Sequence, residues 1–147
     1  MKGAILVEKI MDHIGIAVRD IDSTLKFYTH ILDAELIDRY VSEAAGVESE
    51  VCILEVNGDR IELLAPTNNT TSPIARFIKQ KGKGVHHIAY RVPDLMEAIA
   101  DLKNSGIRIL EDSLRTNKHG RRLVYLNPAD TEGTIIEYCD YPGIAKE

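Results

Sequence analysis

The sequence has no tryptophan and only two cysteines, Cys52 and Cys139, among its 147 residues. The two thiols are far apart in the chain and form no CxxC pair, so neither a disulfide framework nor a cysteine zinc site is indicated. Long apolar runs are absent too: the apolar stretch in residues 1–13 is too short for a signal peptide, and no run reaches membrane-spanning length. We therefore expect a cytoplasmic protein without a membrane partner.

An excess of positive charge is also missing. The net charge is −5, and no stripe of lysine and arginine appears, which argues against a nucleic-acid partner. What is present is a globular composition, 44% hydrophobic and 28% charged, in a chain of single-domain size. Two local basic clusters, residues 79–84 and 119–122, are typical of solvated loops, but they could also hold an anionic ligand.

The chain repeats itself. Residues 12–28, DHIGIAVRDIDSTLKFY, align without a gap on residues 86–102, HHIAYRVPDLMEAIADL, so that His13 matches His87. The ends of the two halves match as well, because Glu62 in RIELLAP corresponds to Glu137 in IIEYCDYP. Each half therefore begins with a histidine and ends with a glutamate, and the repeat is the strongest signal in the sequence.

Each half is predicted to fold as a βαβββ module, which makes the protein α+β. Apolar runs predict strands over 12–19 and 86–93, and Asp20 and Asp94 then stand where helix N-caps are expected. Apolar residues at helical spacing follow both aspartates, and Gly106 is placed to end the second helix. The remaining predicted strands are 34–41, 50–57, 59–66, 107–112, 121–127 and 133–140.

Two further signals fix the module boundaries. Asn57-Gly58 predicts a tight hairpin, and Ser72-Pro73 predicts the start of a short helix. We expect a single domain made of a first module over about residues 10–67, a linker helix over 72–82 and a second module over about 84–142.

Strand alternation separates the two adjacent histidines of the second half. His87 shares its strand face with Ala89, and His13 shares its face with Gly15, so small residues leave room beside both; His86 points the other way. If the modules pack with approximate two-fold symmetry, four matched residues converge: His13, Glu62, His87 and Glu137. Two imidazoles and two carboxylates suit a divalent metal ion. Four unrelated solvated residues would be the alternative, but matched positions in matched modules favour the metal site.

These features resemble the vicinal oxygen chelate superfamily, whose paired βαβββ modules form a cup-shaped, mostly antiparallel sheet around a metal ion. More narrowly, residues 72–92, SPIARFIKQKGKGVHHIAYRV, resemble the methylmalonyl-CoA epimerase family, which carries a closely similar segment. DHIGIAVRDID, IELLAP, the His119-Gly120 pair, Asn127-Pro128 and IIEY also fit. The resemblance covers nearly the whole chain, from residue 10 to residue 142.

The resemblance implies a metal-dependent epimerase that acts on an acyl-CoA substrate through a metal-stabilised enolate. The ligands of the family map onto His13, Glu62, His87 and Glu137, with Glu62 where several members have glutamine. Cobalt, zinc, manganese and nickel all remain open as the metal, and a homodimer is expected. Phosphate contacts to coenzyme A are expected from basic residues of the two local clusters: Lys79, Lys81, Lys83 and Arg121.

The same resemblance implies two carboxylate bases on opposite faces of the substrate. Glu137 is one candidate. For the other, some members place a glutamate three residues into a segment that begins with a GV pair; here that position is Ser49, with Glu48 and Glu50 on either side. We favour Glu50 slightly over Glu48, although a tight turn at 57–58 would place Glu50 on the strand face opposite that of Glu62 unless a bulge intervenes.

Other functions on this scaffold stay open. A glyoxalase I-like lactoylglutathione lyase would use the same four ligands, although the 72–92 segment disfavours it, and a metal-free drug-binding module would lack the ligand set. An extradiol oxygenase would need two histidines and one carboxylate around Fe(II), so a fourth ligand argues against it. Of the remaining histidines, we expect His30 and His119 at the surface and His86 partly buried on the helix-facing side.

Overall fold

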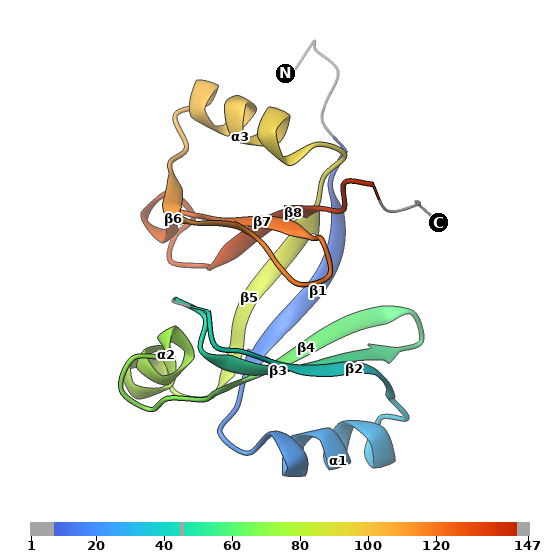
Figure 1. Cartoon of the computed structure of the whole chain (residues 1–147). Helices are drawn as coiled ribbons and strands as arrows, with labels where there is room; N and C mark the ends of the chain where they lie inside the picture. Colours follow the sequence, from blue (N-terminus) through green and yellow to red (C-terminus); the bar gives the residue numbers. More distant parts are fainter. Residues whose placement is uncertain (1–7, 45, 144–147) are drawn as a thin grey trace. The chain divides into compact units, whose positions relative to one another are not determined.

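The computed structural model describes residues 8–44 and 46–143. Among these residues are three α-helices and eight strands (Figure 1), and the strands are hydrogen-bonded in the order β2-β3-β4-β1-β5-β8-β7-β6. The described residues form two compact units, one within residues 13–87 and the other made of residues 88–143 together with 8–12. Two strands, β1 (Ile10–Ala17) and β5 (Gly84–Arg91), pass from one unit into the other.

The first unit, residues 13–87, is built on an antiparallel meander. β2 (Glu35–Ser42) pairs with β3 (Ser49–Val56), which pairs with β4 (Asp59–Pro66), and β1 runs parallel to β4. The hairpin between β3 and β4 turns at Asn57 and Gly58, both of which have positive φ, as a type I′ turn requires. The register of β3 on β4 is continuous from Ser49↔Pro66 to Val56↔Asp59, so this hairpin contains no bulge.

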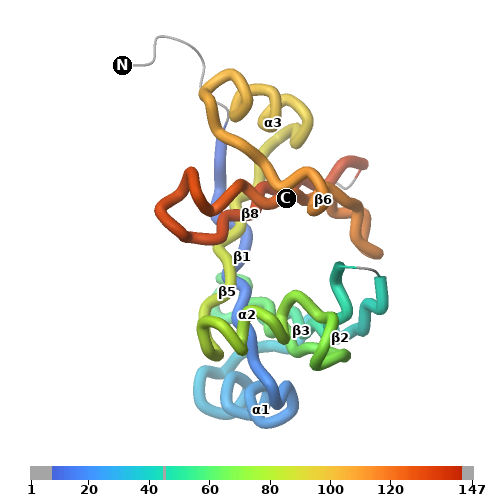
Figure 2. The backbone as a smooth tube through the Cα atoms, turned by 90° about the vertical axis from the view of Figure 1, so that its left-hand side faces the viewer, coloured from blue at the N-terminus to red at the C-terminus, as the bar shows by residue number. Residues whose placement is uncertain are grey.

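Two helices cover opposite faces of this meander (Figures 1 and 2). α1 (Ile21–Ile31) starts at the predicted N-cap Asp20 and packs over a cluster that includes Cys52, Leu54 and Leu63. α2 (Pro73–Lys81) starts at the buried N-cap Ser72, and its apolar side chains pack against Val51, Ile53 and Leu64. Neighbouring residues of a strand point to opposite faces, so Cys52 and Leu54 of β3 face α1, whereas Val51 and Ile53 face α2. The predicted linker helix is therefore part of the first unit.

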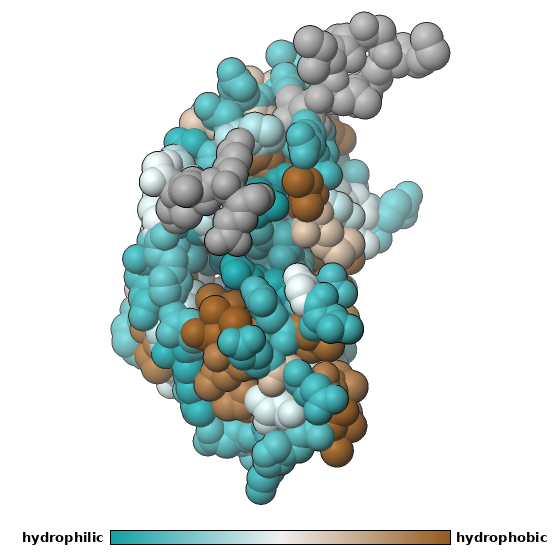
Figure 3. All heavy atoms as spheres, turned by 90° about the vertical axis from the view of Figure 1, so that its right-hand side faces the viewer, coloured by the Kyte–Doolittle hydropathy of each residue, from teal (hydrophilic) through white to brown (hydrophobic). Residues whose placement is uncertain are grey.

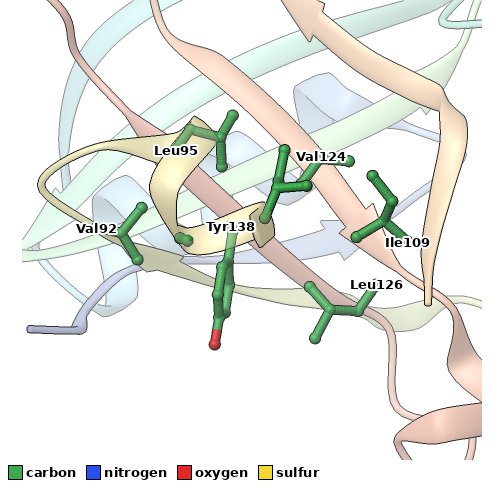
Figure 4. Packing of buried hydrophobic residues seen from close by; sticks show 8 residues of the cluster. Val92, Leu95, Ile109, Val124, Leu126 and Tyr138 are labelled. Carbon is green, nitrogen blue, oxygen red and sulfur yellow. The ribbon is translucent and has the colours of Figure 1, made fainter. Parts of the chain in front are cut away.

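The second unit repeats the strand arrangement of the first and the helix after its first strand. β5 runs parallel to β8 (Ile136–Asp140). β8 pairs antiparallel with β7 (Arg122–Leu126), and β7 pairs antiparallel with β6 (Ile109–Thr116). α3 (Leu95–Asn104) begins at Asp94, the predicted N-cap, and a short 3₁₀ helix, Pro128–Asp130, follows β7. Figure 4 shows the core of the second unit. The Tyr138 ring lies there among aliphatic side chains that include Val92, Leu95, Ile109, Val124 and Leu126.

The strand registers confirm the internal repeat. Gly15 is level with Glu62 in the parallel pair β1–β4, and Ala89 is level with Glu137 in the parallel pair β5–β8. The predicted α+β class with tandem βαβββ modules is confirmed, and antiparallel pairs outnumber parallel ones. Two strands depart from prediction by more than two residues. β6 spans Ile109–Thr116 instead of 107–112, because its register shifts between Leu110 and Arg115 and hides the alternation, and β8 starts at Ile136 instead of 133.

The surface mixes hydrophilic and hydrophobic side chains, and Figure 3 shows exposed hydrophobic patches on one side of the molecule. Among the residues that the structure describes, half of the exposed large hydrophobic ones belong to α1, β2 and the loop between them: Phe27, Ile31, Leu32, Leu36, Ile37 and Val41. Within the described residues, every helix is too short or too polar to span a lipid bilayer.

Candidate metal centre

Three of the four predicted ligands meet inside the first unit. His13 Nε2 is 3.0 Å from His87 Nε2 and 3.5 Å from Glu62 Oε2, and candidate ligand atoms of all three residues lie within 4.8 Å of one another. Their exposed fractions are 1%, 3% and 3%, so the polar atoms converge in a region closed to bulk solvent. Buried ionisable groups of this kind are retained where they bind one another or a metal ion.

The strands place the three side chains by register. His13 lies two residues before Gly15 on β1, and Gly15 is level with Glu62 on β4, so His13 and Glu62 project from the same face. This is also the face on which α2 packs, since Leu64, two residues after Glu62, belongs to the α2 cluster. His87 comes from β5, at the end of the first unit.

Gly15 makes room for the ring of His87. A Cβ atom built on Gly15 would overlap the His87 imidazole, with Cε1, Nδ1 and Nε2 all too close for a real side chain. The sequence predicted that small residues would leave space beside His13, and the structure shows what fills that space at residue 15. Close approach to another group is one of the roles that only glycine can fill.

The spacing of the donor atoms fits chelation of one metal ion. Two ligands at about 2.1 Å from a metal ion and about 90° apart are separated by about 3.0 Å. The distance between the Nε2 atoms of His13 and His87 equals this value, and the Glu62 oxygen lies at a similar separation from His13. Imidazole nitrogens with a carboxylate oxygen form a donor set that borderline divalent ions accept. The residues present therefore fit a divalent metal ion.

His86 contacts the far side of the His87 ring. The Nδ1 atoms of the two histidines are 2.9 Å apart, so that one donates a hydrogen bond to the other. The His86 ring packs edge-on against Phe77 of α2 with 4.7 Å between ring centroids, and burial lowers the pKa of His86 to about 4. His86 was expected to be partly buried toward a helix, which is confirmed, but its contact with His87 was missed.

The fourth predicted ligand, Glu137, belongs to the second unit, where it is 1% exposed. Its Oε2 lies 3.9 Å from Arg121 Nη2, and Arg121 Nη1 lies 4.0 Å from Asp12 Oδ2. The Tyr141 hydroxyl donates to Asp12 at 2.9 Å, and burial, followed by the charge of Asp12, raises the pKa of that hydroxyl. Glu137 thus lies beside a buried cation, and its role as a metal ligand and base stays a prediction.

The predicted phosphate contact Arg121 requires a correction. The residue is only 6% exposed and sits between two buried carboxylates, so it is not placed as a surface anchor for coenzyme A. The three lysines, Lys79, Lys81 and Lys83, lie at the end of α2 and just beyond it and are exposed, as expected for solvated cations. His30 and His119 are exposed as well.

The structure does not bring the predicted base Glu50 to the His13–Glu62–His87 group. Because the β3–β4 hairpin has no bulge, Glu50 lies on the α1 face, opposite the face of Glu62. Its carboxylate accepts a hydrogen bond from Arg39 Nε at 2.6 Å, and Arg39 also pairs with Asp22 of α1. The alternative, Glu48, accepts from the Thr71 hydroxyl at 2.6 Å, in the loop before α2.

A family model, curated relatives and solved structures all relate this chain to the same group of proteins. The Glyoxalase/Bleomycin resistance protein/Dioxygenase superfamily model matches residues 12–125. The chain is 34% identical over 128 residues to the mitochondrial methylmalonyl-CoA epimerase of Homo sapiens, covering 86% of this chain and 71% of that protein. It is similar to the methylmalonyl-CoA epimerase structure from Mycobacterium tuberculosis, with a TM-score of 0.82 and 30% identity over 95% of this chain and 92% of that one. A variant of the Streptomyces coelicolor epimerase in complex with 2-nitronate-propionyl-CoA has the same TM-score and identity over 94% and 98%.

Proposed function

The chain belongs to the glyoxalase/bleomycin resistance protein/dioxygenase superfamily, and we propose that it is an epimerase that interconverts the two epimers of methylmalonyl-CoA. The observation that carries this proposal is the buried group of His13, Glu62 and His87, in a chain one-third identical to methylmalonyl-CoA epimerases over most of its length.

The reaction explains why such a group is needed. The hydrogen on the carbon next to a thioester is weakly acidic, so its removal leaves an enolate whose negative charge must be stabilised. A divalent cation at the His13–Glu62–His87 site would act there as a Lewis acid. Carboxylate side chains can then take the proton from one face of the carbon and return it on the other.

The residues of this chain have separable roles in the proposal. His13 and His87 would bind the cation through Nε2, and Glu62 would bind it through a carboxylate oxygen. A His87 ring that coordinates through Nε2 carries its hydrogen on Nδ1 and donates it to Nδ1 of His86. Because burial keeps His86 neutral at neutral pH, its Nδ1 can accept that hydrogen bond and hold the His87 ring in orientation.

Glu137 would complete the ligand set and serve as one of the two proton-transfer bases. The guanidinium of Arg121 lies 3.9 Å from this carboxylate and offsets part of the cost of burying a negative charge there. Four ligands with two nitrogen and two oxygen donors leave cobalt, zinc, manganese and nickel as the candidate metals, since all accept this mixture.

Coenzyme A would be bound by exposed basic residues, and Lys79, Lys81 and Lys83 are the candidates that remain after the correction of Arg121. We also propose that the protein acts in the cytoplasm as a homodimer. The exposed hydrophobic side chains of α1 and β2 are compatible with such an association.

The activity can be tested by following exchange and inversion at one carbon. Each single epimer of methylmalonyl-CoA is incubated with the protein in deuterium oxide, and deuterium incorporation and epimer ratio are measured. We expect both exchange and inversion, and we expect His87→Ala to abolish both, whereas the exposed His30→Ala retains them. Turnover of the methylglyoxal–glutathione adduct without inversion of methylmalonyl-CoA would instead identify a glyoxalase I-like lyase.

A further inference from the structure

A bulge in β2 turns Asp38 onto the face of the first unit from which His13 and Glu62 project, here called the metal-site face. The register of β2 on β3 shifts between Leu36 and Asp38, so that Ile37 has no opposite residue. Before the bulge, Leu36 is opposite Leu54, which packs on the α1 side; after it, Asp38 is opposite Ile53, which packs on the α2 side. Without the extra residue, Asp38 would point toward α1.

The shift aligns Asp38 with Glu62 across three adjacent strands. Asp38 is opposite Ile53, and Ile53 is in turn opposite Glu62. Adjacent strands are about 4.8 Å apart, which places the Asp38 and Glu62 backbones about 10 Å from each other on one face. Asp38 is half-buried, and one of its carboxylate oxygens accepts from the backbone amide of Arg39 at 2.8 Å.

Other carboxylates of the first unit are less well placed. Glu50 is on the opposite face and accepts a hydrogen bond from Arg39. Glu48 precedes the first residue of β3 and accepts a hydrogen bond from Thr71. Glu55 shares the face of Glu62 but forms an ion pair with Arg60, 3.6 Å away, next to the exposed hairpin. Glu35 is exposed at the first residue of β2.

We propose that Asp38 is a proton-transfer base of the epimerisation, a proposal that rests on the function proposed above. Its carboxylate takes the hydrogen of the carbon next to the thioester as a proton, and the electron pair of the broken C–H bond enters the enolate. In the opposite direction, protonated Asp38 returns the proton to the same face of the carbon. Asp38 therefore serves one epimer, and a second carboxylate, for which Glu137 is the candidate, serves the other.

This assignment predicts an asymmetric defect in Asp38→Asn. Inversion should fall at least 100-fold, because loss of a general base costs about 10² to 10⁴ in rate. Deuterium exchange should also be lost for the epimer whose proton faces Asp38. The other epimer should still exchange within about threefold of the wild-type rate, since its base is intact. Asp38→Asn should bind Co²⁺ as the wild type does, judged by the visible absorption of the bound ion.

Glu55→Gln is the matched control, because Glu55 is a carboxylate on the same face and next strand. It should exchange and invert both epimers at wild-type rates. Asp38→Asn that exchanges both epimers, or neither, with Co²⁺ bound would overturn the assignment, as would the one-sided defect in Glu55→Gln. If the wild-type protein exchanges neither epimer, the proposed function itself fails, and that outcome is distinct from a failure of Asp38 alone.

Discussion

The imidazole of His87 occupies the space into which a side chain at residue 15 would project, so the ring position of the histidine on β5 requires the glycine on β1. Gly15 is also level with Glu62 on β4. The missing side chain at residue 15 therefore leaves the space in which the ring of one candidate ligand, His87, lies near another, Glu62.

Gly15→Ala should weaken metal binding without unfolding the protein. The added methyl group displaces the His87 ring, and small displacements of a ligand lower affinity strongly, so we expect at least a tenfold higher dissociation constant for Co²⁺ in a spectroscopic titration. Ile14→Val, on the opposite face of the same strand, is the control and should bind Co²⁺ normally. Unchanged affinity in Gly15→Ala would show that the packing seen here does not govern the site.

His86→Leu should also lower metal affinity, by about 10- to 100-fold, because the acceptor that orients His87 is lost. His86→Asn, whose side-chain oxygen can accept a hydrogen bond, should recover part of the loss. Partial recovery separates orientation of the ligand from packing against Phe77, since neither substitution keeps the aromatic contact. Equal losses in both variants would argue that His86 acts through packing alone.

Glu50→Gln should retain epimerisation. Its carboxylate is on the α1 face and pairs with Arg39, so the substitution should cost only about 0.5–1 kcal/mol of the free energy of unfolding, as is usual for partly exposed ion pairs. Urea denaturation and the exchange assay measure the two quantities. A loss of exchange with the fold intact would mean that β3 presents the other face to substrate.

Arg121→Met should destabilise the second unit by about 3 kcal/mol, because it leaves the carboxylates of Asp12 and Glu137 buried without their shared cation. Asp12→Asn combined with Arg121→Met should recover part of this loss, since one of the two negative charges is then removed. The free energy of unfolding, measured for both variants at pH 7, tests the expectation. No recovery in the double variant would show that packing, and not charge, explains the effect.

The ion pair between Arg108 and Asp130 predicts a contribution to stability that depends on pH. Hydrogen bonds from the Arg108 side chain and backbone amide lower the pKa of Asp130 to about 2. At pH values between the unfolded pKa near 3.8 and the folded pKa near 2, Asp130 binds more protons in the unfolded chain than in the folded one. The stabilisation by this ion pair is therefore fully present above pH 3.8 and is lost as the pH falls through 2. Asp130→Asn should therefore lose less stability than the wild type between pH 5 and pH 2.5, with Asp101→Asn as the control.

The parts of the site that follow from repetition could be predicted from the sequence. Matched positions identified His13, Glu62 and His87, and strand alternation separated His87 from His86. The βαβββ order followed from apolar periodicity, helix caps and the Asn57-Gly58 turn, all of which depend on neighbouring residues.

Features that depend on irregular backbone or on contacts distant in sequence could not be predicted. Asp38 reaches the face of His13 and Glu62 only through a bulge, which no pattern in β2 predicts. Arg121 is in a basic cluster that indicated a solvated loop, yet it pairs with carboxylates at opposite ends of the chain. The contact between His86 and His87 required the ring orientations, because adjacent residues of a strand point apart by default.

The central claim is that His13, Glu62 and His87 bind a divalent cation that the reaction requires. The most direct measurement is to remove metal from the wild-type protein with a chelator, titrate it with Co²⁺, and record bound metal and deuterium exchange into methylmalonyl-CoA in the same samples. We expect about one equivalent of Co²⁺ per chain, with exchange absent before the titration and rising in proportion to bound metal, and neither in His87→Ala. Full exchange in the metal-free protein, or stoichiometric binding that His87→Ala does not affect, would contradict the account.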